Sequence, residues 1–383
     1  MLHDARGESS RRLLRDCPSR LAVFSLAAVM LCAVPLEASA AGECKFKPQR
    51  PPMLKSMGLC NYDPETQSYA GNPVQQAACL LTPVLKIGKL GPPRDGLPAE
   101  IAYRVGRNTG LPDREAIRTL LQERGLENVF GPTLERPVAQ AHDGDPIARG
   151  ATYFAIHDTS APNYMGKPFP SNINDEGGIN RLTNYSCSNN IERAHVFISR
   201  TGEIMLAHDF EKPWRATKFE MWPEFGSALK GLYLHIELVQ PRRRIPGRGW
   251  ANDFEAPDPG FTPPQYDALA LVYVIASMRA GFWMIPSFHA VIDEGIWDKH
   301  DDPQNFELEA FARSIRNLMD RMPRSEEPVI SLIRKDPTRL PTSPAQASAQ
   351  AAAEPRTPPI ATEDVSGTAA PPASPDSGRP PGL

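Results

Sequence analysis

Two of the few histidines in this chain follow predicted strands. His157 comes directly after the apolar run 152–156 (TYFAI), and His289 follows a second short apolar run at 282–285 (FWMI). An acidic pair, residues 301–302, comes a little further along the chain. Two neutral imidazoles and one carboxylate are a ligand set of the kind that a catalytic zinc ion takes, with the fourth position left to water. The residue types are therefore compatible with a zinc site whose chemistry is hydrolysis, although a single histidine at a strand end is more often a packed or hydrogen-bonded core residue.

Two other residues could take part in such a reaction. Glu237 lies in the alternating run 231–239 (GLYLHIELV), on the same face as His235 and opposite the leucines. A carboxylate near a metal site can accept a proton from water and pass it to a leaving amine. Lys299 precedes the acidic pair, where an ammonium group could stabilise a developing oxyanion. Taken alone, Glu237 is better explained as an outward-facing strand residue, and Lys299 is equally well explained as an exposed lysine.

The elements that must position these residues begin at about residue 150. Short apolar runs alternate there with helix signals, which indicates an α/β or α+β domain. The clearest helix begins at Thr262, with Pro263 and Gln265 completing a capping box, and ends at Gly281. The other predicted elements are strands at 152–156 and 231–239, a hairpin formed by 194–199 and 203–207, and a helix over about 307–322.

The two ends of the chain have a different character. Arginines, an uncharged run at 21–36 and a small-residue cleavage pattern predict a signal peptide over 1–40, with a retained membrane anchor as the alternative. Residues 326–383 are Pro/Ala-rich and predict a disordered tail. Residues 41–149 predict a loop-rich extension with one helix capped by Asp113. The domain with the candidate site is then 150–325, and the protein is expected to be exported, periplasmic or secreted, with no membrane span after signal cleavage.

Charge and cysteine content narrow the choice of class further. The 42 lysines and arginines balance 45 acidic residues, so a nucleic-acid partner held by a basic field is not expected. Four cysteines remain beyond the signal and lack the C-x-x-C spacing of a zinc site. In an exported protein they predict disulfides, with the pairing open. These cysteines are Cys44, Cys60, Cys79 and Cys187.

Several short segments, taken in order, resemble the zinc-dependent N-acetylmuramoyl-L-alanine amidases of type 2, which share a fold with peptidoglycan recognition proteins. The segments span about 150 to 320 and are YFAIHDTS at 153–160, AHVFI at 194–198 with Thr201-Gly202, IEL at 236–238, Gln265-Tyr266, Phe288-His289, and Lys299-x-Asp301. The resemblance implies a mixed central sheet flanked by helices. It also implies a zinc ion bound by His157, His289 and Asp301, with Glu237 as general base and Lys299 as the catalytic lysine.

The third ligand is the least certain part of this alignment. The K-T-D-P-G-x-x-F stretch of the family aligns with 299–306, which selects Asp301. The family's Asp-Pro pair is displaced by one residue here, so Asp302 is a rival, and His300 is a weaker one.

Three other polar residues and a basic run have open roles. His195 would contact substrate or form a structural hydrogen bond, and His235 and Asp158 could orient the ligands. The basic residues Arg242–Arg244 and Arg248 are expected to be solvated loop charge, or to meet carboxylates of the substrate.

The implied reaction is hydrolysis of the amide between N-acetylmuramic acid and L-alanine, in peptidoglycan or in muropeptides. A non-catalytic peptidoglycan-binding module of the same fold is the alternative. A zinc peptidase is a third possibility, and the H-E-x-x-H motif of its commonest type is absent from the sequence. The sequence leaves the preferred substrate size and the oligomeric state open.

Overall fold

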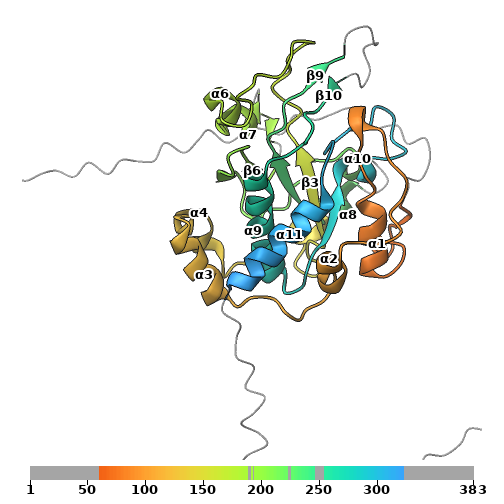
Figure 1. Ribbon diagram of the computed structural model, residues 1–383. Helices are drawn as coiled ribbons and strands as arrows, with labels where there is room; N and C mark the ends of the chain where they lie inside the picture. Colours follow the sequence, from red (N-terminus) through yellow and green to blue (C-terminus); the bar gives the residue numbers. More distant parts are fainter. Residues whose placement is uncertain (1–59, 189–190, 193, 223–225, 246–253, 323–383) are drawn as a thin grey trace, which may run out of the picture. The chain divides into compact units, whose positions relative to one another are not determined.

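A computed structural model describes residues 60–322, except 189–190, 193, 223–225 and 246–253 (Figure 1). The expected signal peptide 1–40 and tail 326–383 lie outside the described residues, as do Cys44 and Arg248.

A mixed five-stranded sheet forms the centre of the fold, with the strand order β11–β3–β8–β6–β7. Strands β11, β3, β8 and β6 run parallel, and β7 is antiparallel to β6. The predicted α/β class, with a mixed central sheet flanked by helices, is confirmed. The strands are β3 (Tyr153–Asp158), β6 (Val196–Ile198), β7 (Ile204–Leu206), β8 (Tyr233–Leu238) and β11 (Ile285–Phe288).

The register of β3 and β8 gathers polar residues on one face of the sheet. His157 lies beside Glu237, and Ala155 lies beside His235. Paired residues of parallel strands point to the same face, and side chains alternate along each strand. His157, His235 and Glu237 therefore share one face, near the carboxyl ends of the strands, where α/β proteins commonly bind ligands.

Two long helices cover the apolar face opposite. In Figure 1, α9 (Pro263–Ala280) and α11 (Leu308–Arg321) lie together across the sheet. The ring of Phe154 in β3 lies 5.1 Å from that of Tyr273 in α9. Helix α9 begins with the expected Thr262–Gln265 capping box and ends at Gly281, whose φ of 78° is left-handed and suits a residue without a side chain.

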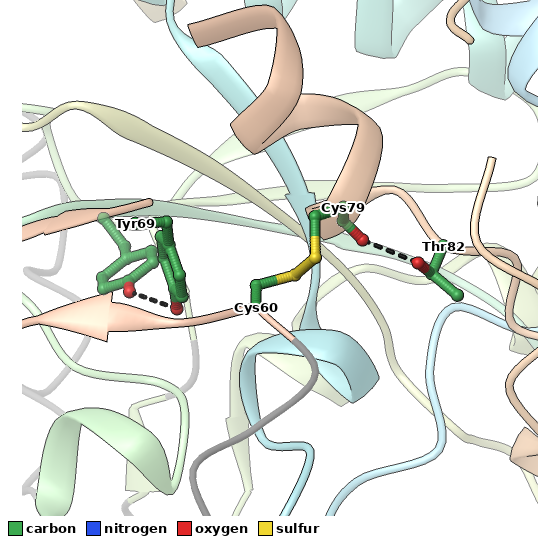
Figure 2. Close-up of a disulfide and its surroundings, with 5 residues drawn as sticks. Cys60, Tyr69, Cys79 and Thr82 are labelled. Carbon is green, nitrogen blue, oxygen red and sulfur yellow. Dashed lines mark hydrogen bonds between the residues drawn. A yellow bond between two sulfur atoms is a disulfide. The ribbon is translucent and has the colours of Figure 1, made fainter. Parts of the chain in front are cut away.

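A short ribbon near the start of the described residues packs on the polar face of the sheet. A ribbon of β1 (Tyr62–Asp63) and β2 (Ser68–Tyr69) places Tyr69 against the sheet. The Tyr69 ring lies 5.3 Å from that of Tyr153, and its hydroxyl lies 2.9 Å from the hydroxyl of Tyr233. A disulfide joins Cys60 to Cys79 in α1 (Pro73–Leu80), as Figure 2 shows. This bridge confirms one expected disulfide.

The extension contains more helix than the sequence pattern indicates. The predicted helix is present as α3, and the side chain of Asp113 accepts a hydrogen bond from the Ala116 amide as its N-cap. The other helices are too short for a periodic pattern, so local sequence does not reveal them. One hydrophobic core includes residues on both sides of position 150. Besides α1, the helices of the extension are η1 (Lys86–Gly88), α2 (Ala99–Arg104), α3 (Arg114–Glu123), α4 (Glu127–Phe130), η2 (Gly131–Thr133) and α5 (Ala141–Gly144).

Short elements complete the described part of the chain. They are α6 (Gly177–Asn180), α7 (Thr183–Ser186), β4 (Cys187–Ser188), β5 (Ile191–Glu192), η3 (Phe219–Met221), α8 (Gly226–Leu229), β9 (Arg243–Arg244), β10 (Phe254–Glu255) and α10 (His289–Ile292). None of the helices described combines the length and the apolar character that a bilayer crossing requires.

Candidate metal centre

Three buried side chains meet where β3 and β11 end. His157 belongs to β3, and His289 is the first residue of α10, directly after β11. Their Nδ1 atoms lie 2.8 Å apart. Asp302 places Oδ1 3.1 Å from His289 Nδ1 and Oδ2 3.9 Å from His157 Nδ1. We call His157, His289 and Asp302 the donor group; their exposed fractions are 1%, 4% and 2%.

The donor group suits a metal ion in both chemistry and spacing. Ligands that lie ~2.0–2.1 Å from a tetrahedral zinc ion are about 3.3 Å from one another. The separations in the donor group, from 2.8 to 3.9 Å, span this value. Two imidazoles and a carboxylate are ligands that zinc and related divalent ions accept. These side chains can therefore hold a metal ion after small adjustments.

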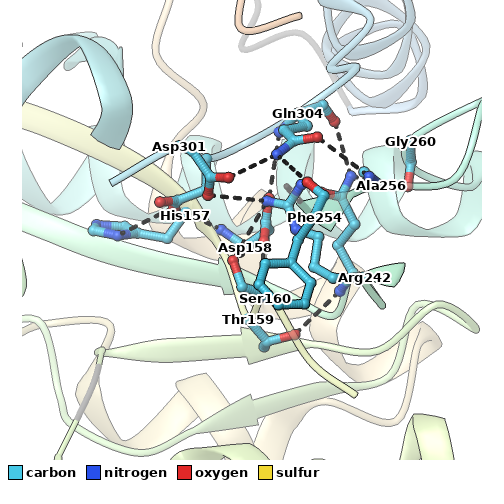
Figure 3. Close-up of polar contacts among 12 residues, drawn as sticks. His157, Asp158, Thr159, Ser160, Arg242, Phe254, Ala256, Gly260, Asp301 and Gln304 are labelled. Atoms are coloured by element: carbon cyan, nitrogen blue, oxygen red, sulfur yellow. Dashed lines mark hydrogen bonds and ion pairs between the residues drawn. The ribbon is translucent and has the colours of Figure 1, made fainter. Parts of the chain in front are cut away.

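The structure brings Asp302, and not Asp301, to the two histidines. The Asp301 carboxylate accepts a hydrogen bond from Gln304 Nε2 at 2.9 Å and lies 3.7 Å from Arg242 (Figure 3). Its Cβ also packs against Gly88, where an added side chain would come within 2.2 Å. These contacts direct Asp301 away from the histidines. The carboxylate of the donor group is therefore that of Asp302, the aspartate directly before proline. It is not that of Asp301, which the alignment from Lys299 to Phe306 selects.

The surroundings of the donor group shift the pKa values of its two histidines in opposite directions. Burial, and next the neighbouring His289, hold the pKa of His157 well below its usual value. Burial also lowers the pKa of His289, but Asp302 and Asp293 outweigh it and raise that pKa well above normal. A metal ion must displace a proton from a protonated histidine, so binding releases protons.

Glu237 and Lys299, the two expected catalytic residues, differ in their relation to the donor group. Glu237 is 8% exposed and lies beside His157 across the β3–β8 pair. Lys299 lies in the segment between α10 and α11, and its Nζ atom pairs with Glu294 Oε2. Burial lowers the pKa of Lys299, and Asp293 opposes this shift. Glu237 is therefore placed next to the donor group by the sheet, whereas the ion-pair partner of Lys299 is Glu294, which lies outside the donor group.

A second set of possible donors shares His289. The Asp293 carboxylate lies 3.1 Å from His289 Nε2 and 3.0 Å from His300 Nδ1. The sequence analysis did not select Asp293. Its position four residues after His289, facing the same side of a helical turn, was the available signal. His300 therefore bonds to Asp293, and its ring also lies against the ring of His289, with the centroids 4.1 Å apart.

Two polar neighbours of the site have structural contacts. The backbone amide of His235 donates to His195 Nδ1 at 3.0 Å, and His195 Nε2 lies 3.0 Å from the Lys212 carbonyl. His195 is fully buried, so the structural hydrogen bond describes its role here. The Asp158 amide donates to Asp302 Oδ2 at 3.1 Å, so Asp158 orients the donor carboxylate through its backbone.

The basic run at 242–244 is not simply solvated loop charge. Arg242 is 1% exposed, and its guanidinium lies 2.6 Å from the Asp158 carboxylate. Burial raises the pKa of Asp158 to about 7, although Arg242 opposes the shift. Arg243 pairs with Glu255 across the β9–β10 ribbon. These two arginines stabilise the loops around the site.

Two hollows lie elsewhere on the described surface. One, of about 270 Å³, is lined by Arg149, Thr152 and Phe282 among others. The other, of about 420 Å³, lies between Arg124, Gly202 and Asp267. Neither includes a residue of the donor group, so their size does not bear on its chemistry.

The fold and the site together define an α/β protein with buried His/Asp groups that could hold a metal ion. Comparisons of the chain with protein-family models, curated proteins and solved structures give no match.

Proposed function

We propose that this protein is an exported, zinc-dependent N-acetylmuramoyl-L-alanine amidase. The observation that carries the proposal is the meeting of His157, His289 and Asp302 at the carboxyl ends of two adjacent parallel strands, with Glu237 beside them. The ordered motifs that resemble the type 2 amidases supply the substrate class, which is the lactyl-alanine amide of peptidoglycan or muropeptides.

The proposed chemistry divides the work among the residues of the site. A zinc ion held by the donor group would supply Lewis acidity to the scissile carbonyl and to water. Glu237 accepts the proton of the attacking water and then donates it to the departing amine of L-alanine. Lys299 stabilises the negative charge that develops on the carbonyl oxygen. The burial of the donor group strengthens each electrostatic interaction, because the local dielectric is low.

Export is supported by the Cys60–Cys79 bridge as well as by the signal-like first forty residues. Disulfides persist in oxidising compartments outside the cytoplasm, where peptidoglycan also lies.

The test is to incubate the purified chain with muropeptides, with and without a chelator, and to identify the products by mass. Release of intact stem peptide from intact sugar, abolished by the chelator, supports the amidase. Zinc binding without any product would instead favour the non-catalytic binding module, and cleavage within the peptide would favour a peptidase.

Glu237→Gln separates the general base from the metal site. We expect a rate about 10²- to 10⁴-fold lower, since a positioned acid–base group contributes that much. Bound zinc, measured by elemental analysis, should stay at the wild-type level. Glu123→Gln, an exposed glutamate of α3, is the matched control. An unchanged rate in Glu237→Gln would remove Glu237 from the mechanism.

A further inference from the structure

Each histidine of the donor group is contacted by a buried acceptor on its outer side. His157 Nε2 lies 3.0 Å from His235 Nδ1, and His235 Nε2 lies 3.2 Å from Glu220 Oε2 and 3.3 Å from Oε1. His235 and Glu220 are both fully buried. A continuous chain of hydrogen bonds thus connects the Glu220 carboxylate to a ligand of the proposed metal ion.

The second histidine lies directly beside a carboxylate, at ion-pair distance, although its Nε2 atom forms no hydrogen bond with the described residues. Its Nδ1 atom faces Asp302, and its Nε2 atom lies 3.1 Å from Asp293 Oδ2. Asp293 is fully buried as well. His157 and His289 therefore both turn Nδ1 towards the donor group and Nε2 towards a chain that ends in a carboxylate.

One short segment, residues 216–220, holds both of these carboxylates. The amides of Ala216 and Thr217 donate to Glu220 Oε2 at 3.1 and 3.0 Å, and the Thr217 hydroxyl donates to it at 2.9 Å. The next two amides, of Lys218 and Phe219, donate to Asp293 at 3.3 and 2.9 Å. The segment thereby fixes the outer partners of both histidines at once.

These contacts determine which ring nitrogen carries the proton in His235 and in His157. A carboxylate only accepts hydrogen bonds, so His235 must donate its Nε2–H to Glu220 and keep Nδ1 as an acceptor. His157 then donates its own Nε2–H to His235, which leaves Nδ1 with a free lone pair. A neutral imidazole in this tautomer is ready to bind a metal ion through Nδ1.

We propose that Glu220 is a positioning residue, an inference that rests on the metal centre of the proposed function. It acts through His235 to hold His157 in the tautomer that binds the metal. Glu220 has no contact with the donor group itself, and nothing in the local sequence marks it.

Glu220→Gln keeps the shape of the side chain but moves the ring proton of His235, and then that of His157, from Nε2 to Nδ1. The amide oxygen takes the position that receives the three donors from Ala216 and Thr217, so the NH₂ group faces His235 Nε2. His235 then accepts there and donates from Nδ1, and His157 must carry its proton on Nδ1. We expect zinc affinity, measured by competition with a chromophoric chelator, to fall about 10- to 100-fold.

Glu100→Gln is the matched control, because Glu100 pairs with Arg104 within α2, which contributes nothing to the donor group. In a His235→Phe background, Glu220→Gln should have no further effect, since the connecting ring is gone. Equal zinc affinities of Glu220→Gln, Glu100→Gln and wild type would overturn the inference. A lower unfolding temperature with unchanged affinity would also overturn it, because that result describes a purely structural role.

The nitrogen-15 spectrum of the zinc-loaded wild-type protein gives a test that needs no variant. We expect Nε2 to be protonated in both His157 and His235, and zinc to shift Nδ1 of His157. A proton on Nδ1 of His235 would overturn the inference. Zinc binding without amide cleavage would refute the proposed function and leave this inference standing. Amide cleavage by the wild-type protein, together with an unaltered zinc affinity in Glu220→Gln, would support the proposed function and refute this inference.

Discussion

Asp301 and Asp302 are adjacent, yet their carboxylates have different surroundings. Asp302 contacts His289 in the donor group, and Asp301 contacts Gln304. We expect Asp302→Asn to weaken zinc binding by more than the ~100-fold that loss of an outer partner can cost, because it removes a charged ligand. Asp301→Asn, the matched control, should stay close to wild type. Competition with a chelator measures the zinc affinity of both variants. A larger loss of affinity in Asp301→Asn would show that Asp301 is the third ligand, as the alignment of 299–306 implies.

Residue types at strand ends were enough to predict the two histidines, but not their partners. The run 152–156 lies almost wholly in β3, which extends to include His157. The second strand is shifted from its prediction, because β11 shares only Ile285 with the run 282–285, but it still ends directly before His289. The choice between two adjacent aspartates depends on the path of a loop, and no periodic pattern encodes it. Glu220 is brought to His235 by a loop between β7 and β8, and its spacing from any ligand carries no signal.

At the scale of elements, the segment that follows the β6–β7 hairpin carries a half-buried histidine, His208, that should make stability depend on pH. Burial, and next the nearby Lys212, lower the pKa of His208 from 6.5 to about 4. Between these pH values the unfolded chain binds more protons than the folded chain. Stability is therefore fully present above pH 6.5 and falls as the pH is lowered towards 4.

His208→Gln should make this decline shallower. One proton corresponds to at most about 1.4 kcal/mol per pH unit, and the effect should be smaller because His208 is partly exposed to solvent. Urea unfolding at several pH values between 7 and about 4 measures the slope of the free energy of unfolding. His142→Gln, which changes an exposed histidine of α5, is the matched control. A slope equal to that of wild type would show that His208 is protonated without cost in the folded protein.

The elements themselves were predictable where the signals are local. Thr262, Gln265 and Gly281 define both ends of α9, and Thr201-Gly202 marks the turn of the β6–β7 hairpin. The strand order of the sheet could not be predicted from local signals, because β3 pairs with β8 and β11 across long separations in the chain. Those pairings depend on burial of both faces of the sheet, which no short segment reveals.

At the scale of the whole molecule, the described N-terminal residues belong to the same core as the site. The hydrophobic cluster extends from Cys60 to Met322. Tyr69 packs against Tyr153 and Tyr233, which are neighbours across β3 and β8 and precede His157 and Glu237 by four residues. A chain that shares one core is expected to unfold as one unit, because neither part can bury its apolar surface alone.

The Cys60–Cys79 bridge tests this expectation, since it closes a loop of 19 residues within the N-terminal part. Replacing both cysteines by serine should lower the free energy of unfolding by about 3 kcal/mol, through the greater freedom of the unfolded chain. Because the core is shared, the whole transition should shift together, whether followed by tryptophan fluorescence or by release of bound zinc. If zinc stays bound while an early transition appears in far-ultraviolet circular dichroism, residues 60–149 fold separately from the site. The wild-type protein under the same non-reducing conditions is the reference, so that the remaining cysteines are treated alike.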